Sequence, residues 1–325
     1  MSAARRQVLV FRELPHDQLA RITAQHDVTV ANPRQGAAQK AAFEAALPQA
    51  EGLIGSSYPI TPALLDAAPR LQVISTISVG VDNYPVAELR RRGIVLCHTP
   101  GVLTETTADT VFSLVMATSR RLIELANHVR DGHWTRNIGE DLFGWDVHGK
   151  TLGILGFGRI GQAVARRAAL GFGMPVQYHN PRPVDVPDLL GRAVHTPLDQ
   201  LLASCDIVVA TLPLTDATRG LLGAREFGLM KPGAIFVNGG RGATVQEPAL
   251  LQALDSGRLR AAGLDVFATE PLPLDSPLRR HPNVTALPHI GSATHETRHA
   301  MATLATSNLL QALAGHAPAA VYRAG

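Results

Sequence analysis

The sequence predicts an α/β fold in which helices enclose parallel β-sheets, arranged in two domains. Three observations predict it. The chain has 325 residues, more than a single hydrophobic core usually supports. Short apolar runs alternate with longer amphipathic segments along the chain. A glycine-rich turn joins one of these runs to a helix near the middle of the sequence.

Ten short apolar runs are the strand candidates, and Gly, Pro, Asn or Asp lies near most of their ends. They are Val8–Phe11, Gly52–Gly55, Leu71–Ser75, Ile94–Cys97, Thr151–Leu155, Val176–Tyr178, Ile207–Ala210, Ala234–Val237, Ala262–Leu264 and Val284–Ala286.

Two longer stretches are predicted helices. Apolar residues recur at roughly helical spacing over about residues 104–130, as Phe112, Val115, Leu122 and Leu125 show, and this stretch is expected to connect the two domains. Residues 294–313 also have a helical pattern, but the pattern does not indicate which domain that helix joins. The proline-containing segment 180–187 is expected to be a loop.

Composition excludes several classes of protein. The formal charge is only +3 and the one dense basic run, residues 90–92, is typical of a solvated helix end, so nucleic acid is not expected as a partner. No apolar stretch is long enough for a membrane helix, and no signal peptide is evident. Cys97 and Cys205 are too few for a disulfide framework, and the 13 histidines form no metal-ligand pattern. We therefore expect a cytosolic, metal-free protein that makes no membrane contact.

A dinucleotide fingerprint follows the strand candidate 151–155. Its sequence is Gly156-Phe157-Gly158-Arg159-Ile160-Gly161, and a helical segment comes next. Gly156 would permit the tight turn, Gly158 would let the backbone approach a pyrophosphate, and Gly161 would let helix and strand pack closely. The phosphates would meet N–H groups at the helix N-terminus.

The end of the next strand favours NADPH over NADH, although NADH stays possible. An NAD-selective site usually has Asp or Glu there to bind the ribose 2′-hydroxyl, whereas this chain has Asn180. A neutral side chain tolerates the 2′-phosphate of NADP, and Arg182 could pair with it, with Arg159 adding charge or stacking on the adenine. The alternative is that Arg182 is only a solvent-exposed loop residue without a role in cofactor binding.

Three polar clusters follow three later strand candidates, and sites in parallel sheets form at the carboxyl ends of strands. They contain Arg241, Glu270 and His289. A carbonyl that accepts hydride needs a proton donor, which His289 could be, with Glu270 orienting its ring. Arg241 could grip a substrate carboxylate and polarise the carbonyl.

At these residues the chain resembles the D-isomer-specific 2-hydroxyacid dehydrogenases, over nearly its whole length. It is most similar to their bacterial glyoxylate/hydroxypyruvate reductase B branch, also called 2-ketogluconate reductase. The matching segments are residues 75–83, 98–100, 102–106 and 288–298. The family's two adjacent basic residues after the Asn are not both present, because Pro181 and Pro183 flank Arg182.

The resemblance implies further assignments. The family has two Rossmann-like, doubly wound domains with an active-site cleft between them, which would place a substrate domain at 1–104 plus 291–325 and an NAD(P)-binding domain at 105–290. Members are usually dimers through the cofactor domain. Arg241, Glu270 and His289 match the catalytic residues. The other matches are Ser78, Val79 and Gly80 for the substrate carboxylate, Asp265 for the nicotinamide amide, and Leu212 and Pro213 for the cofactor cleft.

The expected activity is reduction of glyoxylate, hydroxypyruvate or 2-ketogluconate to the D-hydroxy acid, and Ser57, Tyr58 and Ser292 could line the substrate pocket. Two alternatives stay open. One is a non-catalytic NAD(P)-sensing corepressor of the same fold, which can retain the three catalytic residues. The other is a different family enzyme, such as 3-phosphoglycerate dehydrogenase.

Overall fold

The chain folds into two compact units, each with its own parallel sheet. The computed structural model describes residues 4–189 and 191–323. Unit 1 comprises residues 1–103 and 294–325, and unit 2 comprises residues 104–293. The chain therefore leaves unit 1, completes unit 2, and returns.

Unit 1 contains a five-stranded sheet of order β2-β1-β3-β4-β5, and every pair of neighbours is parallel. Its elements are β1 (Gln7–Val10), α1 (His16–Thr23), β2 (Asp27–Val30), α2 (Ala37–Ala46), β3 (Gly52–Gly55), α3 (Pro62–Asp66), β4 (Val73–Thr76), α4 (Val86–Arg91), β5 (Val95–Cys97) and α11 (His295–Leu313).

The last helix belongs to unit 1, where it packs along β3, β4 and β5 and against α1. The contact is close: a Cβ on Gly52 would lie 2.9 Å from Leu309 Cδ1, and Ser75 Oγ donates a hydrogen bond of 2.7 Å to Ala305 O. The opposite face of the sheet buries a second layer, which includes Phe43 of α2, Leu65 of α3 and Leu89 of α4.

Unit 2 contains a seven-stranded, all-parallel sheet of order β12-β11-β10-β9-β6-β7-β8. Its elements are α5 (Thr104–Ser119), α6 (Leu122–Arg130), β6 (Leu152–Leu155), α7 (Arg159–Arg166), β7 (Val176–His179), β8 (Ala193–His195), α8 (Leu198–Ser204), β9 (Ile207–Ala210), α9 (Ala224–Leu229), β10 (Ala234–Asn238), α10 (Glu247–Asp255), β11 (Leu259–Leu264) and β12 (Val284–Ala286).

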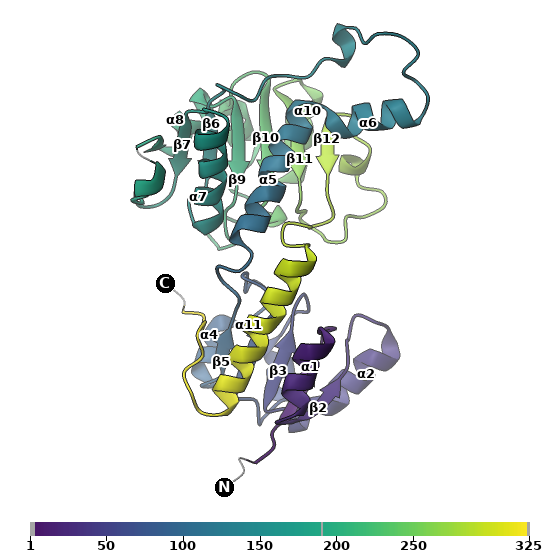
Figure 1. Ribbon diagram of the computed structural model, residues 1–325, viewed down its shortest axis with the longest axis vertical. Coiled ribbons are helices and arrows are strands. Elements are labelled where there is room, and N and C mark those ends of the chain that lie inside the picture. Colours follow the sequence, from purple (N-terminus) through teal and green to yellow (C-terminus); the bar gives the residue numbers. More distant parts are fainter. Residues whose placement is uncertain (1–3, 190, 324–325) are drawn as a thin grey trace. The chain divides into compact units, whose positions relative to one another are not determined.

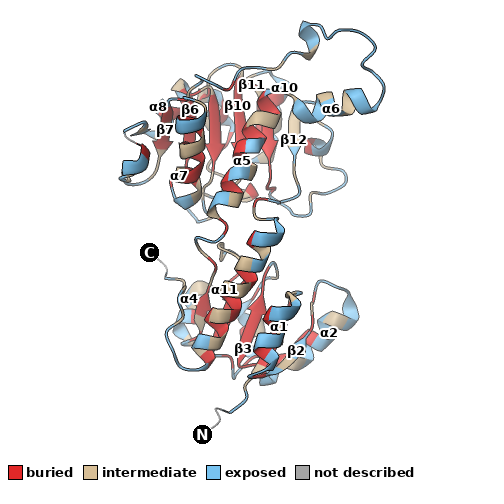
Figure 2. Cartoon of the chain, viewed as in Figure 1, coloured by how far each residue is buried: buried red, intermediate tan, exposed pale blue. Residues whose placement is uncertain are grey.

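The central strands of unit 2 are buried on both faces, as Figure 2 shows. On β9, Ile207 and Val209 join the core under α5 and α7, whereas Val208 and Ala210 join the core under α8, α9 and α10. Successive side chains of a strand point to opposite faces, so a strand covered on both sides must be apolar throughout. This is why these strands were visible as continuous apolar runs.

The expected α/β fold with two parallel sheets is confirmed, and the ten strand candidates all correspond to strands, with shifted ends at several. Two strands were missed, β2 and β8. Both lie at sheet edges, and most of their side chains are exposed or half-buried. A strand without a buried face needs no apolar run, so it leaves no hydrophobic signal.

The single helix expected over residues 104–130 is wrong. The structure has α5 and α6, separated at Arg121, whose φ of 54° is left-handed. Arg121 is held there by hydrogen bonds from its guanidinium to the carbonyls of Asp141 and Phe143 and to the Glu124 carboxylate. Phe112 and Val115 are buried in α5, whereas α6 has no buried residue, because after Arg121 the chain turns away from the core.

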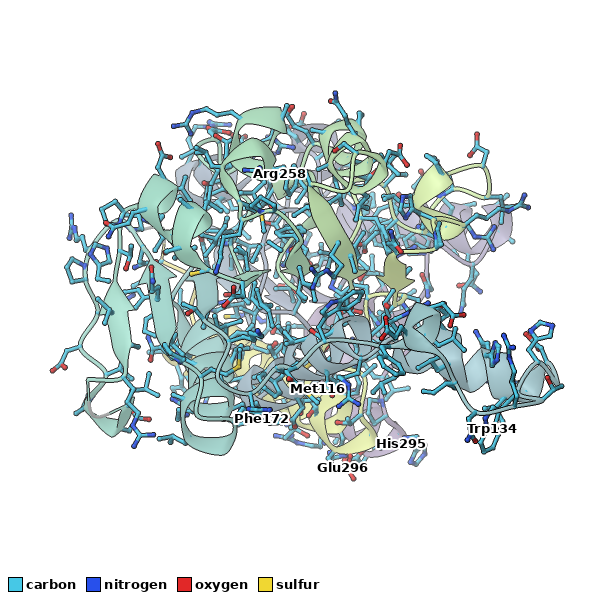
Figure 3. The ribbon with its side chains drawn as sticks, turned by 90° about the horizontal axis from the view of Figure 1, so that it is seen from above. Met116, Trp134, Phe172, Arg258, His295 and Glu296 are labelled. Carbon is cyan, nitrogen blue, oxygen red and sulfur yellow. The ribbon has the colours of Figure 1, made fainter. Side chains whose placement is uncertain are left out.

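Residues 122–145 form an arm that projects from unit 2 (Figure 1). Trp134 lies far out on this arm in Figure 3. The arm returns to the body at Trp145, whose backbone N–H donates to Ser119 O at 2.9 Å and whose ring centroid lies 4.1 Å from the Arg260 guanidinium carbon.

Among the described residues, no helix combines the length and apolar character needed to cross a bilayer. Within residues 4–189 and 191–323, no group of His, Cys, Asp and Glu is arranged to hold a metal ion. Cys97 and Cys205 are buried free thiols, and burial raises their pKa to about 12 and about 11, respectively.

Candidate functional site

Three adjacent strands of unit 2 deliver polar side chains to one edge of the sheet. The strands β10, β11 and β12 are neighbours and parallel, so their carboxyl ends meet at the same edge (Figure 1). Arg241 follows β10, Glu270 follows β11 and His289 follows β12.

His289 and Glu270 form a direct pair, with His289 Nδ1 2.7 Å from Glu270 Oε2. The other carboxylate oxygen, Oε1, accepts a hydrogen bond of 3.0 Å from Phe267 N–H. Burial raises the pKa of Glu270, but the hydrogen bonds from His289 and Phe267 outweigh it, and the pKa is lowered overall. Glu270 is therefore an ionised acceptor at neutral pH, and it contacts the imidazole through Nδ1 and not through Nε2.

His289 is oriented by its backbone as well as by Glu270. Its φ of 54° is left-handed, which is uncommon for a residue with a side chain. The loop that contains it is fixed by Asp265, whose carboxylate oxygens accept hydrogen bonds from Ile290 N–H at 2.7 Å and Gly291 N–H at 2.8 Å. Burial raises the pKa of Asp265, and the two N–H donors oppose that rise. No sequence pattern predicts that Asp265 holds this loop.

Arg241 lies in a loop packed directly against the Glu270 loop. A Cβ on Gly242 would lie 1.9 Å from the carbonyl carbon of Phe267, so only glycine allows this approach. Asn238 holds the Arg241 loop in two places, by donating to Arg241 O at 3.1 Å and accepting from Gly240 N–H at 3.0 Å. The positive charge of Arg241 also contributes to lowering the pKa of Glu270.

The glycine-rich turn lies between β6 and α7 in the same unit. Gly156 has a left-handed φ of 88°, and its Cβ position lies 3.1 Å from the Leu212 backbone. A Cβ on Gly161 would lie 2.4 Å from Gly156 O, which is where the helix packs on the turn. The Cβ position of Gly158 has nothing within 4 Å, so this side of the turn is open above the N-terminus of α7.

These features fit a dinucleotide. The open side of Gly158 and the first N–H groups of α7, at Arg159, Ile160 and Gly161, form a suitable place for a pyrophosphate. Leu212 and Pro213 follow β9, next to β6 in the sheet. The side chain of Phe157 points into the core instead, stacking on Tyr178 with 3.8 Å between ring centroids.

Asn180 links the glycine turn to the loop that contains Arg182. Its side chain accepts from Phe157 N–H at 3.3 Å and donates to Arg182 O at 3.3 Å. Its own carbonyl oxygen lies 2.8 Å from His195 Nε2. Arg182 and Arg159 are exposed, and neither forms an ion pair with any residue that the structure describes.

The remaining predicted site residues are divided between the two units. Ser292 follows the Asp265-bound turn in unit 2 and is half-buried. Ser78, Val79 and Gly80 follow β4 in unit 1, and their backbone N–H groups donate to no acceptor within the described ranges. Ser57, with a left-handed φ of 61°, and Tyr58, which packs on Phe43, follow β3 in unit 1.

The structure thus brings Arg241, Glu270 and His289 together, and Asp265 with them, on the same sheet as the glycine turn. It places the Ser78–Gly80 loop, Ser57 and Tyr58 on the sheet of unit 1.

Comparison with known proteins identifies the family. Residues 112–291 match the model of the NAD-binding domain of the D-isomer-specific 2-hydroxyacid dehydrogenases. The chain is 52% identical over 309 residues, 95% of each chain, to glyoxylate/hydroxypyruvate reductase B of Citrobacter koseri. The chain belongs to the D-isomer-specific 2-hydroxyacid dehydrogenase family.

Solved structures agree with this assignment. The dehydrogenase superposes with a TM-score of 0.89 on a protein from Thermus thermophilus that is 43% identical, covering 98% of this chain and 100% of that one. It superposes with a TM-score of 0.86 on the NADPH-dependent glyoxylate/hydroxypyruvate reductase of Sinorhizobium meliloti, solved with NADP and malonate. That protein is 31% identical, and the match covers 98% of this dehydrogenase and 97% of the other chain.

Proposed function

We propose that this dehydrogenase reduces small 2-keto acids, namely glyoxylate, hydroxypyruvate and 2-ketogluconate, to D-2-hydroxy acids with NADPH. One observation carries the proposal: a hydrogen-bonded His289–Glu270 pair lies beside Arg241 at the carboxyl edge of a dinucleotide-binding sheet. Relatives about half identical over most of the chain are named glyoxylate/hydroxypyruvate reductases, which supports the first two substrates.

The residues divide the chemistry between them. NADPH, when bound, supplies the hydride. Arg241 binds the substrate carboxylate and polarises the carbonyl with its planar, permanently charged fork. His289 donates a proton from Nε2 to the oxygen that becomes an alkoxide, because Nδ1 is occupied by Glu270. Ionised Glu270 fixes the ring and stabilises the imidazolium before transfer.

The dinucleotide is bound by the turn Gly156–Gly161 at the N-terminus of α7, flanked by Leu212 and Pro213, with Asp265 near the nicotinamide amide. NADPH is preferred because Asn180 brings no negative charge and because Arg182 and Arg159 are exposed cations without an acidic partner among the described residues. The NADP complex of the Sinorhizobium meliloti relative supports this preference. NADH is expected to bind more weakly.

We assign the substrate domain to unit 1 and the cofactor domain to unit 2. The substrate carboxylate is bound by the three N–H groups of Ser78, Val79 and Gly80, which have no acceptor of their own in the described structure. Three successive N–H donors at one strand end form an anion-binding turn. Ser292, which follows the Asp265-bound turn in unit 2, is proposed as a further substrate contact.

The functional form is proposed to be a cytosolic homodimer formed through unit 2. The arm over residues 122–145 exposes large apolar side chains, and exposed apolar surface of this kind favours association. These residues are Leu122, Ile123, Val129, Trp134, Ile138, Phe143 and Trp145. Free, buried Cys97 and Cys205 agree with a reducing compartment.

The deciding experiment compares kcat/KM on glyoxylate, hydroxypyruvate, 2-ketogluconate, pyruvate and phenylpyruvate, with NADPH and with NADH, for the wild type and for His289→Ala. The wild type is expected to prefer the first three substrates with NADPH. His289→Ala is expected to lower kcat by about 10²–10⁴-fold while the Kd for NADPH stays within about twofold.

His299→Ala is the matched control, because His299 also pairs with a carboxylate, Asp17, at 2.9 Å, but lies on α11 of unit 1. It is expected to keep full turnover. A wild-type kcat in His289→Ala would remove His289 from the role of proton donor. Binding of NADPH with no turnover of any keto acid would instead favour a dinucleotide-sensing protein.

A further inference from the structure

Two arginines of unit 1 converge on the turn that follows β3. Arg12, just after β1, donates from Nη1 to Ser56 Oγ at 2.5 Å and to Ser57 Oγ at 3.2 Å. Arg34, just before α2, donates from Nη1 to Ser57 O at 3.0 Å. Ser56 is almost fully buried, at 4% exposure, and Ser57 has a left-handed backbone. The turn therefore holds both guanidinium groups in one place.

This arginine cluster, Arg12 and Arg34 with Arg298 of α11 nearby, brings like charges close together. Burial lowers the pKa of Arg12, and the like charges of Arg298 and Arg34 lower it further. Neither Arg12 nor Arg34 forms an ion pair with any carboxylate of the described residues, whereas Arg6, Arg92 and Arg167 all do. Converging cations of this kind become favourable when an anion occupies the space between them.

The cluster lies on the same sheet edge as the loop Ser78–Gly80. In the order β1-β3-β4, Arg12 follows the first strand, the Ser56–Ser57 turn follows the second and Ser78–Gly80 follows the third. Parallel neighbours are about 4.8 Å apart, so β1 and β4 end about 10 Å from each other. A keto acid of five or six carbons, helped by the length of the arginine side chains, can span that distance.

We propose that the arginine cluster binds a second anionic group, a carboxylate or a phosphate, at the far end of a longer 2-keto acid whose first carboxylate lies on Ser78–Gly80. The inference rests on the proposed function and specifies its substrate class. The site would then accept glyoxylate as a minimal substrate and favour dianionic 2-keto acids. Substrates that end in a carboxylate and substrates that end in a phosphate distinguish which of these two groups the cluster binds.

The test measures kcat/KM with NADPH for pairs of keto acids that have the same number of carbons and differ in whether the far end is charged. 2-Oxoglutarate is compared with 2-oxopentanoate, 2-oxoadipate with 2-oxohexanoate, and 3-phosphohydroxypyruvate with hydroxypyruvate. At least one dianion is expected to exceed its partner by about ten- to hundredfold, the value of a hydrogen bond to a charged group. Arg34→Ala and Arg12→Ala are expected to remove this preference, mainly through KM, and to leave glyoxylate turnover unchanged.

The Arg34 variant and one further control keep the result interpretable. Arg12 also binds buried Ser56, so Arg34→Ala is the variant that keeps the hydrogen bond to Ser56 and removes only one to exposed Ser57. Arg91→Ala removes an equal charge from α4 of unit 1, where the side chain is 70% exposed, and is expected to preserve the preference.

Equal kcat/KM values for the dianions and for their partners with an uncharged end would overturn the inference. Turnover of glyoxylate in the same assay would still support the proposed function. A preference that survives in both Arg34→Ala and Arg12→Ala would also overturn it. An equal loss on glyoxylate and on dianions in Arg34→Ala would mean that the cluster acts on the fold and not on a distal anion. No turnover of any keto acid would overturn the proposed function and this inference together.

Discussion

Glu270 is the residue whose protonation most directly affects the site, because its carboxylate accepts from both His289 and Phe267. Its pKa is lowered in the folded chain, so ionised Glu270 stabilises the fold above the ordinary Glu pKa of about 4.3. That contribution is lost as the pH falls through the lower folded-state pKa.

Glu270→Gln is expected to lower kcat/KM by about 10–100-fold, because an amide cannot stabilise the imidazolium. The alkaline fall in reduction rate should move to lower pH. In urea, the variant should be less stable than the wild type at pH 7, and the difference should shrink as the pH falls below about 4. Asp17→Asn, which removes the carboxylate from the His299–Asp17 pair, should change neither profile. An unshifted pH–rate profile in Glu270→Gln would contradict the pairing role.

Arg182 tests the cofactor preference. Arg182→Ala is expected to raise the Kd for NADPH by about 10–100-fold and to leave that for NADH within about twofold, because only NADPH has the 2′-phosphate. Fluorescence titration of both cofactors measures this. Arg279→Ala, another exposed arginine of unit 2, is the control. Equal losses for the two cofactors would show that Arg182 does not bind the phosphate.

At the residue scale, the grouping of Arg241, Glu270 and His289 could be predicted because parallel strands align their carboxyl ends. The contacts that hold these three residues in place could not be predicted. Asp265 binds the N–H groups of Ile290 and Gly291, 25 and 26 residues further along the chain, and no sequence pattern marks that contact. The left-handed backbone of His289 has no signal either, because it is imposed by surrounding structure.

The loops between strands and helices control how closely the catalytic side chains approach. Gly242→Ala would place a Cβ 1.9 Å from the Phe267 carbonyl carbon and force the Arg241 and Glu270 loops apart. We expect a loss of stability of about 1–3 kcal/mol and a fall in kcat/KM of about a hundredfold.

Gly228→Ala is the control for Gly242→Ala. Its Cβ position in α9 has no atom within 4 Å, and Ala is favoured over Gly in a helix, so stability should be kept or raised. Thermal melts and steady-state rates measure both variants. Full activity in Gly242→Ala would show that the close loop contact is not needed for catalysis.

At the element scale, burial decides what the sequence reveals. The two-sided cores made the central strands visible, whereas β2 and β8 at the edges were missed. The periodicity of α5 continues into α6, which hid the break at Arg121. That break depends on carbonyls of Asp141 and Phe143, about twenty residues ahead, so a local pattern cannot contain it.

The arm allows a test at the scale of the whole molecule. A chain of 34.6 kDa that pairs through residues 122–145 should have twice that mass by sedimentation equilibrium. The double variant Trp134→Ser, Ile138→Ser should be monomeric at micromolar concentration, because it removes two large side chains that are 61% and 47% exposed. Leu274→Ser, at an 80% exposed apolar residue outside the arm, should leave the mass unchanged. A monomeric wild type would contradict the proposed dimer.

The discontinuity of unit 1 has a consequence for synthesis on the ribosome. Residues 104–293 are contiguous, so unit 2 can complete its sheet as soon as it has emerged. Unit 1 must wait, because α11, which covers β3, β4 and β5, is translated last. Until α11 is synthesised, the apolar face of the unit 1 sheet that it will cover stays exposed to solvent, although the strands of that sheet were synthesised first. Unit 1, whose strands are synthesised first, is therefore the unit that completes its folding last.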